Sequence, residues 1–295
     1  MKWFSTIPAT VQGPIWMVTG GVLLILMAID IRYLAPRYSI LEMIFIRNVI
    51  TLGFILPWAY RTGISGLATA RFPLHVIRNV TLYMGNLGWF IGVTLVSLAD
   101  LSALQFTMPL FTVVMAAVIL REEVGRRRWS ATVIGFAGAL IIIRPGFIPI
   151  ELGTMVVILS ALFYASSHIT SKKLSATESP KLVLFYMGVV IVPLSLGPAL
   201  FVWVAPRWED ALPFLILGVT GAGQTYCIIR AFAAADASFI TLFDFLRLPV
   251  AAAIGLLLFA ETTEVWTWIG AVVIFGATYY ITWYETTARA RNKSP

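Results

Sequence analysis

Residues 14–34 read PIWMVTGGVLLILMAIDIRYL, and the only charged side chains in this stretch are Asp30 and Arg32, near its end. The hydrocarbon core of a bilayer is about 30 Å thick, and a helix of about 20 apolar residues crosses it. The whole chain is 59% hydrophobic and 12% charged, with a mean hydropathy of +0.89. A soluble domain of 295 residues cannot bury that much apolar surface. The sequence therefore predicts a polytopic integral membrane protein.

Further apolar stretches of similar length follow the first one along the chain. We expect all of them to be helices, because in lipid only a helix satisfies its own backbone hydrogen bonds. The predicted spans are 14–34, 38–60, 72–96, 100–120, 128–146, 151–171, 181–204, 210–232, 237–259 and 263–284. The connections between them are short, so we expect ten transmembrane helices and no inserted soluble domain.

The positions of Lys and Arg predict the orientation of these spans. With a cytoplasmic N-terminus and ten crossings, thirteen of these residues fall on the inner side and four on the outer side. The inner set is Lys2, Arg61, Arg71, Arg121, Arg126, Arg127, Arg128, Lys172, Lys173, Lys181, Arg289, Arg291 and Lys293. The outer set is Arg32, Arg37, Arg144 and Arg207. Both termini are predicted to be cytoplasmic, in a bacterial-type inner membrane.

This topology also accounts for the net charge of +7, so the basic composition does not indicate nucleic-acid binding. Cys227 is the single cysteine and lies inside a predicted span, which excludes a disulfide framework and a thiolate metal site. His75 and His168 lack a cysteine partner, and we expect both at the cytoplasmic mouth in contact with water. We expect no metal and no cofactor.

An internal repeat divides the chain near its middle. Residues 99–102 read ADLS and residues 235–238 read ADAS, and each is followed by a span with one internal proline, Pro109 or Pro249. The offset between the copies is about half the chain, which leaves five spans in each. Because five is odd, the second copy enters the membrane upside down relative to the first. Secondary transporters use such inverted repeats to alternate between two open states.

These motifs resemble the EamA-type repeat of the drug/metabolite transporter superfamily over nearly the whole chain. The residues that carry the resemblance are Leu98-Ala99-Asp100, Pro109-Leu110-Phe111, Leu120-Arg121-Glu122-Glu123, Arg128-Trp129, Gly135-Phe136-Ala137-Gly138, Arg144-Pro145-Gly146, Phe243 to Pro249, Phe259-Ala260-Glu261 and Trp268-Ile269-Gly270. The resemblance implies one five-helix repeat at 14–146 and a second at 151–284. It further implies a ten-helix basket whose cavity is lined mainly by the third, fourth, eighth and ninth spans, with the fifth and tenth at the periphery of a possible homodimer.

Charged residues inside spans are the first candidates for a binding site, because each costs about 2.5–3.5 kcal/mol at the bilayer centre on insertion scales. They are Glu42 and Arg47 in the second span, Arg78 in the third, and Asp244 with Arg247 in the ninth. The arginines outnumber the carboxylates, and Arg binds carboxylate or phosphate in a bidentate manner. A substrate-binding role is predicted for Arg47, Arg78, Asp244 and Arg247, and Glu42 and Asp244 are candidates for binding a coupling ion. The alternative is a structural ionic network that holds helices together.

Polar residues at similar depth form a second group of predicted substrate contacts. They are Tyr83, Asn86, Gln105, Gln224 and Tyr226. The alternative for the amides is an interhelical hydrogen bond, worth on the order of 0.6 kcal/mol. Pro109 and Pro249 are expected to bend their helices and to act in gating.

The function predicted from these features is secondary transport of a small zwitterionic or anionic metabolite, with membrane lipid as the surrounding medium. An intramembrane enzyme and a receptor or channel are the alternatives. A metalloprotease motif H-E-x-x-H, a serine-hydrolase motif G-x-S-x-G and a Gly-rich phosphate loop are all absent from the sequence. We therefore expect a transporter and not an enzyme.

Overall fold

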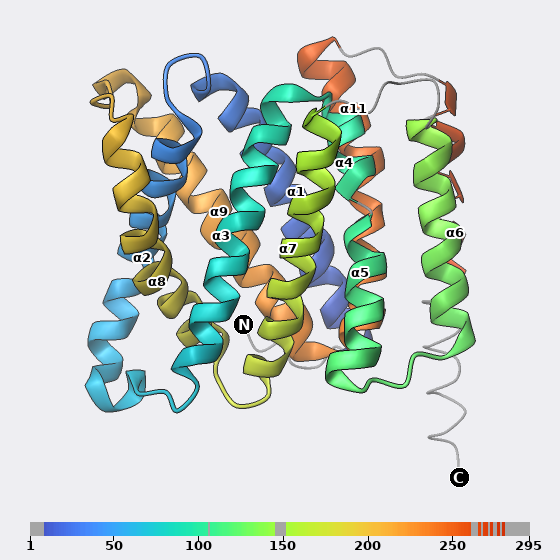
Figure 1. Cartoon of the computed structure of the whole chain (residues 1–295), viewed down its shortest axis with the longest axis horizontal. Helices are drawn as coiled ribbons and strands as arrows, with labels where there is room; N and C mark the ends of the chain where they lie inside the picture. Colours follow the sequence, from blue (N-terminus) through green and yellow to red (C-terminus); the bar gives the residue numbers. More distant parts are fainter. Residues whose placement is uncertain are drawn as a thin grey trace.

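The structure of the chain is a computed structural model. It describes residues 9–105, 107–144 and 152–260, together with 265–266, 268–270, 272–273, 276–277 and 279–280. Within these residues every regular element is a helix, and the long helices stand roughly parallel to one another (Figure 1). The all-helical membrane fold predicted from the sequence is therefore confirmed.

The first half of the chain contains three long helices, then three shorter helical elements and a further long helix. In chain order these elements are α1 (Ala9–Leu34), α2 (Ile40–Leu67), α3 (Phe72–Leu95), α4 (Leu98–Gln105), α5 (Thr107–Met115), the π-helix η2 (Ala116–Leu120) and α6 (Arg126–Ile143). The second half repeats this order with α7 (Leu152–Ser175), α8 (Pro180–Phe201), the short 3₁₀ helix η3 (Trp208–Asp210), α9 (Ala211–Ala234), α10 (Ala237–Ile240), the 3₁₀ helix η4 (Thr241–Leu246) and α11 (Arg247–Phe259).

Five helices in the described part are long and apolar enough to cross a membrane by themselves. They are Val11–Leu34, Ile40–Leu67, Leu152–Ser175, Pro180–Phe201 and Trp208–Ala234. The predicted ninth span is built from shorter helical pieces. Residue 106 of the predicted fourth span and most of the predicted tenth span, 263–284, lie outside the described residues. The ten-helix count therefore stays a prediction.

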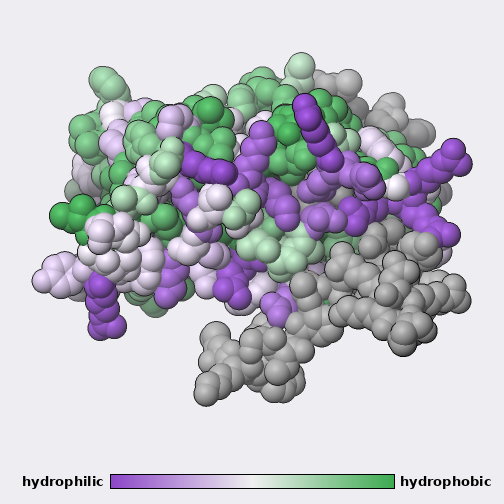
Figure 2. Space-filling model, turned by 90° about the horizontal axis from the view of Figure 1, so that it is seen from below, coloured by the Kyte–Doolittle hydropathy of each residue, from purple (hydrophilic) through white to green (hydrophobic). Residues whose placement is uncertain are grey.

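The two ends of the bundle differ in charge. We call the end where α1 passes into α2 the upper end and the end where α2 passes into α3 the lower end, as they lie in Figure 1. Hydrophilic side chains run across the face that is seen from below in Figure 2. The exposed basic residues at this end are Arg61, Arg71, Arg121, Arg126, Arg127, Lys173 and Lys181.

The predicted ninth span changes its helical geometry just before Pro249. The 3₁₀ helix η4 ends at Leu246, and Pro249 is the third residue of α11. The backbone N–H groups in the first turn of a helix have no intrahelical partner, so a proline there loses no hydrogen bond. The bend predicted at Pro249 thus coincides with a change from 3₁₀ to α geometry. Residue 106, which precedes α5, lies outside the described residues, so the bend expected near Pro109 stays a prediction.

Helix ends also correspond between the two halves. Ser39 and Ser179 are the N-caps of α2 and α8, and both side chains accept a backbone N–H. Arg121 and Ala260 end η2 and α11 in the left-handed conformation, with φ of 56° and 52°. Equivalent boundaries therefore recur about half a chain apart, in agreement with the repeat in the sequence.

The halves are joined by long helix pairs that cross between them. α3 packs along α7, α1 packs along α9, and α2 lies against α8. Glycines allow the close approach: a Cβ at Gly88 on α3 would lie 2.8 Å from Ser160 Cβ on α7, and one at Gly20 on α1 would lie 3.3 Å from Cys227 Cβ on α9. Small residues at helix contacts are typical of membrane proteins, where van der Waals packing replaces the hydrophobic effect between helices.

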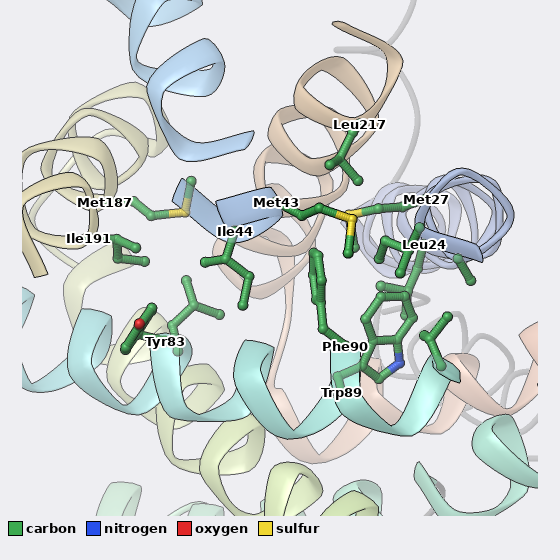
Figure 3. Packing of buried hydrophobic residues seen from close by; sticks show 14 of the residues in the cluster. Leu24, Met27, Met43, Ile44, Tyr83, Trp89, Phe90, Met187, Ile191 and Leu217 are labelled. Atoms are coloured by element: carbon green, nitrogen blue, oxygen red, sulfur yellow. The ribbon is translucent and has the colours of Figure 1, made fainter. Parts of the chain in front are cut away.

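The largest hydrophobic cluster lies where α1, α2 and α3 meet α8 and α9. Figure 3 shows Phe90 and Trp89 of α3 below Met27 and Met43, with Tyr83 further along α3 on the side of Ile44, Met187 and Ile191. Phe90 is completely buried. This packing holds α2 against the centre of the bundle, where its charged residue Arg47 lies.

Candidate functional site

A small cavity at mid-height, which we call the central cavity, gathers polar side chains from several helices. It has a volume of about 20 Å³ and is lined by Gly20, Gly21, Leu24, Gln105, Met108, Tyr164, His168, Gln224, Ile228, Asp244 and Arg247. Pockets that hold small molecules have volumes of about 300–1,000 Å³. The central cavity is therefore much smaller than a pocket that holds a metabolite, and the helices around it would have to separate before a metabolite could bind there.

Asp244 and Arg247 form an ion pair on the wall of the central cavity. Asp244 Oδ2 lies 3.3 Å from Arg247 Nη2, and both side chains are buried. Asp244 lies in η4, and Arg247 is the first residue of α11. Residues three apart are eclipsed in a 3₁₀ helix, which brings the two side chains to the same side of the chain. The interruption of the span thus places both charges at the cavity.

Arg47 lies one layer away from the cavity, on α2. Its side chain is 3% exposed, Nη1 lies 3.5 Å from Met27 Sδ, and the guanidinium stacks 5.5 Å from the centre of the Phe90 ring. Among the described residues it has no carboxylate partner. Arg47 interacts electrostatically with Tyr164, and so does Arg247, so Tyr164 lies near both guanidinium groups.

The helix α7 contributes two aromatic side chains to the cavity. The Tyr164 hydroxyl donates to Asn86 Oδ1 at 2.8 Å, which places Asn86 behind Tyr164 as seen from the cavity. His168, one turn further along α7, is 7% exposed and packs against Phe232, with ring centroids 4.9 Å apart. The prediction that His168 lies in water is wrong, because α7 continues to Ser175 and leaves His168 well inside the helix.

Two predicted amides line the cavity from different helices. Gln105 Nε2 of α4 donates to Val157 O and to Ser160 Oγ, both at 3.2 Å. Gln224 of α9 accepts through Oε1 from the Thr225 hydroxyl at 3.3 Å. Gln105 is thus held in place by α7, and both side chains reach the site where sequence analysis expected them.

Other predicted substrate contacts lie elsewhere in the bundle. Arg78 is buried and donates to Ser171 Oγ at 2.7 Å and to Asn79 Oδ1 at 2.6 Å, so polar groups of its own surroundings hold it. Tyr83 belongs to the hydrophobic cluster in Figure 3. Tyr226 packs edge to face against Trp16, away from the cavity, because residues two apart on a helix do not share a face with Gln224.

Glu42, a predicted ion-coupling residue, lies in the first turn of α2 at the upper end. It is completely buried, and its Oε2 accepts from Val204 N at 3.3 Å. Asp30 of α1 is a further buried carboxylate, 9% exposed, that the search for charges inside spans did not select. The signal that could have identified Asp30 as a candidate is its position inside an apolar stretch of the sequence. With Asp30 and Asp210 included, the described residues contain four buried carboxylates and three buried arginines, so the predicted excess of arginine is not found.

A cluster centred on Asp210 closes the upper end. Asp210 accepts two hydrogen bonds from Arg37 Nη1, at 2.6 and 2.9 Å, and one from the Tyr38 hydroxyl at 2.8 Å. Asp210 is completely buried. The cluster therefore ties the α1–α2 connection to the start of α9.

A second acid-centred cluster closes the lower end. Glu178, in the α7–α8 connection, accepts from the Thr69 hydroxyl and lies 2.5 Å from His75 Nε2. The His75 ring stacks on Tyr186 of α8, with ring centroids 4.3 Å apart, and is completely buried. His75 is therefore a packed structural contact, contrary to the prediction of a solvated side chain.

A larger hollow of about 660 Å³ opens at the upper end and is lined in part by Arg32, Tyr38 and Thr94. The Arg32 side chain is held at the wall of this hollow, because its guanidinium donates to Val93 O at 3.2 Å and to Val96 O at 3.0 Å. We place the candidate site in the central cavity and not in this hollow, because the buried ion pair and the polar side chains from opposite halves meet at the centre.

The helices around the central cavity agree in part with those implied by the family resemblance. The fourth, eighth and ninth predicted spans line it as implied. The difference is that α1 and α7 also line it directly, whereas α3 lies behind α7. The physical reason is the glycine face of α3: a Cβ at Gly85 would lie 3.1 Å from the Tyr164 ring. α7 therefore sits directly on α3 and turns its own side chains toward the centre.

These features define a polytopic membrane protein with charged groups at a closed central site, which is the class that includes secondary transporters. Residues 11–144 and 151–283 each match the model of the EamA-like transporter family. The chain belongs to this family, within the drug/metabolite transporter superfamily. It is an integral membrane transporter of small metabolites and not an enzyme.

Curated relatives cover nearly the same length. An S-adenosylmethionine uptake transporter of Rickettsia prowazekii is 30% identical over 254 residues, 86% of each chain. A riboflavin transporter of Vibrio cholerae is 32% identical over 288 residues, 96% of this chain and 97% of the relative. A solved protein structure superposes with a TM-score of 0.75 at 15% identity, over 97% of this chain and 99% of the other, which shows a shared fold.

Proposed function

We propose that the protein is a secondary transporter that moves a small zwitterionic or anionic organic metabolite by alternating access. The observation that carries this proposal is Arg47, which is buried at mid-height and has no carboxylate partner among the described residues. A buried charge is unfavourable unless it is paired, solvated or matched by a ligand. A carboxylate or phosphate of the substrate would supply the missing partner.

The substrate site in this proposal consists of Arg47, Tyr164, Gln105 and Gln224 together with the Asp244–Arg247 pair. The guanidinium groups take the anionic part, and the ring and amides take the less polar remainder. The relatives named for S-adenosylmethionine and riboflavin both carry a substrate with a flat heteroaromatic ring. An aromatic side chain such as Tyr164 offers a stacking surface for such a ring.

Alternating access would use two inverted repeats, residues 14–146 and 151–284. Exchange of the halves converts the α1–α9 contact into the α7–α3 contact, so the two long pairs support a two-fold relation. The clusters around Asp210 and Glu178 are also exchanged, and they close opposite ends. In the proposed cycle one cluster opens while the other stays closed, with movement of the spans at Pro109 and Pro249.

The basic lower end would face the cytoplasm in a bacterial inner membrane. The exposed Lys and Arg residues around Arg126 and Lys173 favour this orientation under the positive-inside rule. Both termini would then be cytoplasmic.

Counterflow in proteoliposomes tests transport directly. Vesicles loaded with unlabelled S-adenosylmethionine or riboflavin are diluted into the labelled compound, in parallel with a panel of amino acids and carboxylates. A transporter accumulates label transiently, because exchange is faster than net loss. Absence of counterflow with every compound, from protein that is folded and correctly inserted, would contradict the proposal.

A further inference from the structure

The Asp244–Arg247 ion pair is built so that a ligand can separate it. The closest atoms are 3.3 Å apart, whereas charge-assisted hydrogen bonds between nitrogen and oxygen are typically about 2.7–2.9 Å. Both side chains are buried, yet both line the central cavity. Asp244 Oδ2 makes no hydrogen bond to a described residue. The Oδ2 atom therefore makes only a long contact with Arg247, and Asp244 lines the space that a substrate would enter.

We propose that this pair receives an α-amino-acid group of the substrate, with the ammonium on Asp244 and the carboxylate on Arg247. The inference rests on the proposed transport function and narrows the substrate to one chemical class. In a zwitterion of this type both charges are attached to one carbon atom. Such a group can enter between the two side chains and replace one long ion pair by two short ones.

Charge balance favours a zwitterion over a simple ion. Among the described residues that line the central cavity, Arg247 is the only Lys or Arg and Asp244 is the only carboxylate. An anion that captured Arg247 would leave Asp244 buried without that cation, and a simple cation on Asp244 would compete with Arg247 for the same carboxylate. Breaking a buried pair on one side is strongly unfavourable. A zwitterion replaces both partners at once and adds no net charge to the site.

The groups that face Asp244 from neighbouring helices do not provide another counter-charge. α7 presents Tyr164 and His168, α9 presents Gln224, and α1 presents glycines. Arg47 does not line the cavity; it stacks on Phe90 and interacts electrostatically with Tyr164. Arg47 can therefore assist a further anionic group of the substrate without replacing Arg247 at Asp244.

The backbone of α1 approaches the pair closely. Gly21 lines the cavity, and a Cβ at this position would lie 3.2 Å from Arg247 Cβ, which is a tight contact. Because Gly21 has no side chain, α1 can lie this close to the pair without filling the cavity. The larger remainder of the substrate then lies toward Tyr164 and Gln105.

Two probe compounds that share the nucleoside and the sulfonium charge test the inference. S-adenosylmethionine carries an α-amino-acid group, and 5′-dimethylsulfonio-5′-deoxyadenosine has a methyl group in place of the chain that bears it. Purified protein should bind S-adenosylmethionine at least about 30-fold more tightly, as measured by ligand-dependent thermal stabilisation and by competition in counterflow. Equal affinity for the two compounds would overturn the inference.

The decisive variant neutralises both members of the pair, Asp244→Asn with Arg247→Gln, so that no lone charge stays buried. We expect it to fold and to bind both probes with nearly equal affinity. The matched control is Arg207→Gln with Glu209→Gln, which removes an exposed ion pair of 3.5 Å and should keep the 30-fold preference. A merely structural pair would lower stability without changing the ratio of the two affinities.

The outcomes separate this inference from the proposed function. If the neutral double variant keeps the preference for S-adenosylmethionine, the head group binds elsewhere and the inference is wrong. If S-adenosylmethionine neither binds nor exchanges, the inference is also wrong. Counterflow of riboflavin or of a simple carboxylate would then still establish the protein as a transporter.

Discussion

Replacing Gly88 with alanine should push α3 and α7 apart and disturb the site through a defined chain of contacts. The added Cβ would lie 2.8 Å from Ser160 Cβ and 3.0 Å from Val156 O. Carbon atoms in favourable contact are about 3.5–4.0 Å apart, so α7 must retreat by roughly 1 Å. Overpacking of this kind costs about 1–3 kcal/mol.

The displacement also reaches two hydrogen bonds. Ser160 Oγ donates to the Gly85 carbonyl at 2.8 Å and accepts from Gln105 Nε2 at 3.2 Å. Each such bond contributes about 0.5–1.5 kcal/mol, so Gly88→Ala should destabilise the protein by about 2–6 kcal/mol in total if both bonds are lost. Because Gln105 lines the central cavity, exchange should slow as well.

Gly197→Ala is the matched control. Gly197 lies within α8, and a Cβ there meets nothing within 4 Å. Alanine should therefore stabilise that helix by about 0.5–1 kcal/mol and leave exchange unchanged. Thermal unfolding in detergent gives the stability of both variants, and counterflow gives the exchange rate. If Gly88→Ala were as stable and as active as Gly197→Ala, backbone contact would not set the distance between α3 and α7.

Four further predictions concern charge, gating and orientation. Arg47→Gln should weaken substrate binding by about 2–5 kcal/mol while the protein elutes as a single species in size-exclusion chromatography; normal affinity would remove Arg47 from the site. Pro109→Ala and Pro249→Ala should leave affinity within a few-fold but slow exchange, because the bend that each proline favours in its span is lost; unchanged rates in both would make these prolines structural. Asp210→Asn should cost about 1–3 kcal/mol in thermal stability and increase labelling of cysteines introduced at the upper end, because the charge that holds Arg37 is lost; unaltered labelling would argue against a closing role. A cysteine at position 293 should react only with reagents that enter the cytoplasm, and external labelling would refute the ten-span topology.

Some features of the site followed directly from the sequence. Arg47, Asp244 and Arg247 were identified because a charge inside an apolar span is unfavourable without a specific partner. Gln105 and Gln224 followed from their depth alone. The same reasoning did not separate them from Tyr83 and Tyr226, because depth along a span does not say which face of the helix meets the centre.

The errors at the histidines have a different origin. The span containing His168 was predicted to end at residue 171, but α7 continues through Ser175 with polar residues that bond to its own backbone. Ser and Thr in a helix can satisfy their hydroxyls on the carbonyl four residues earlier, so hydropathy places the helix end too early. His75 was misplaced for a related reason, since its partner Glu178 lies about a hundred residues further along the chain.

The sequence by itself determined that the chain is a helical membrane protein with an internal repeat. Both conclusions depend on local quantities, namely the length of apolar stretches and the spacing of short motifs, and the bilayer permits few other structures for such segments. Only the tertiary structure decided which charges share a cavity. That outcome depends on how closely helices approach, and glycines such as Gly21 and Gly85 allow contacts that no property of a single span reveals. It also depends on the 3₁₀ turn that brings Asp244 and Arg247 to one side.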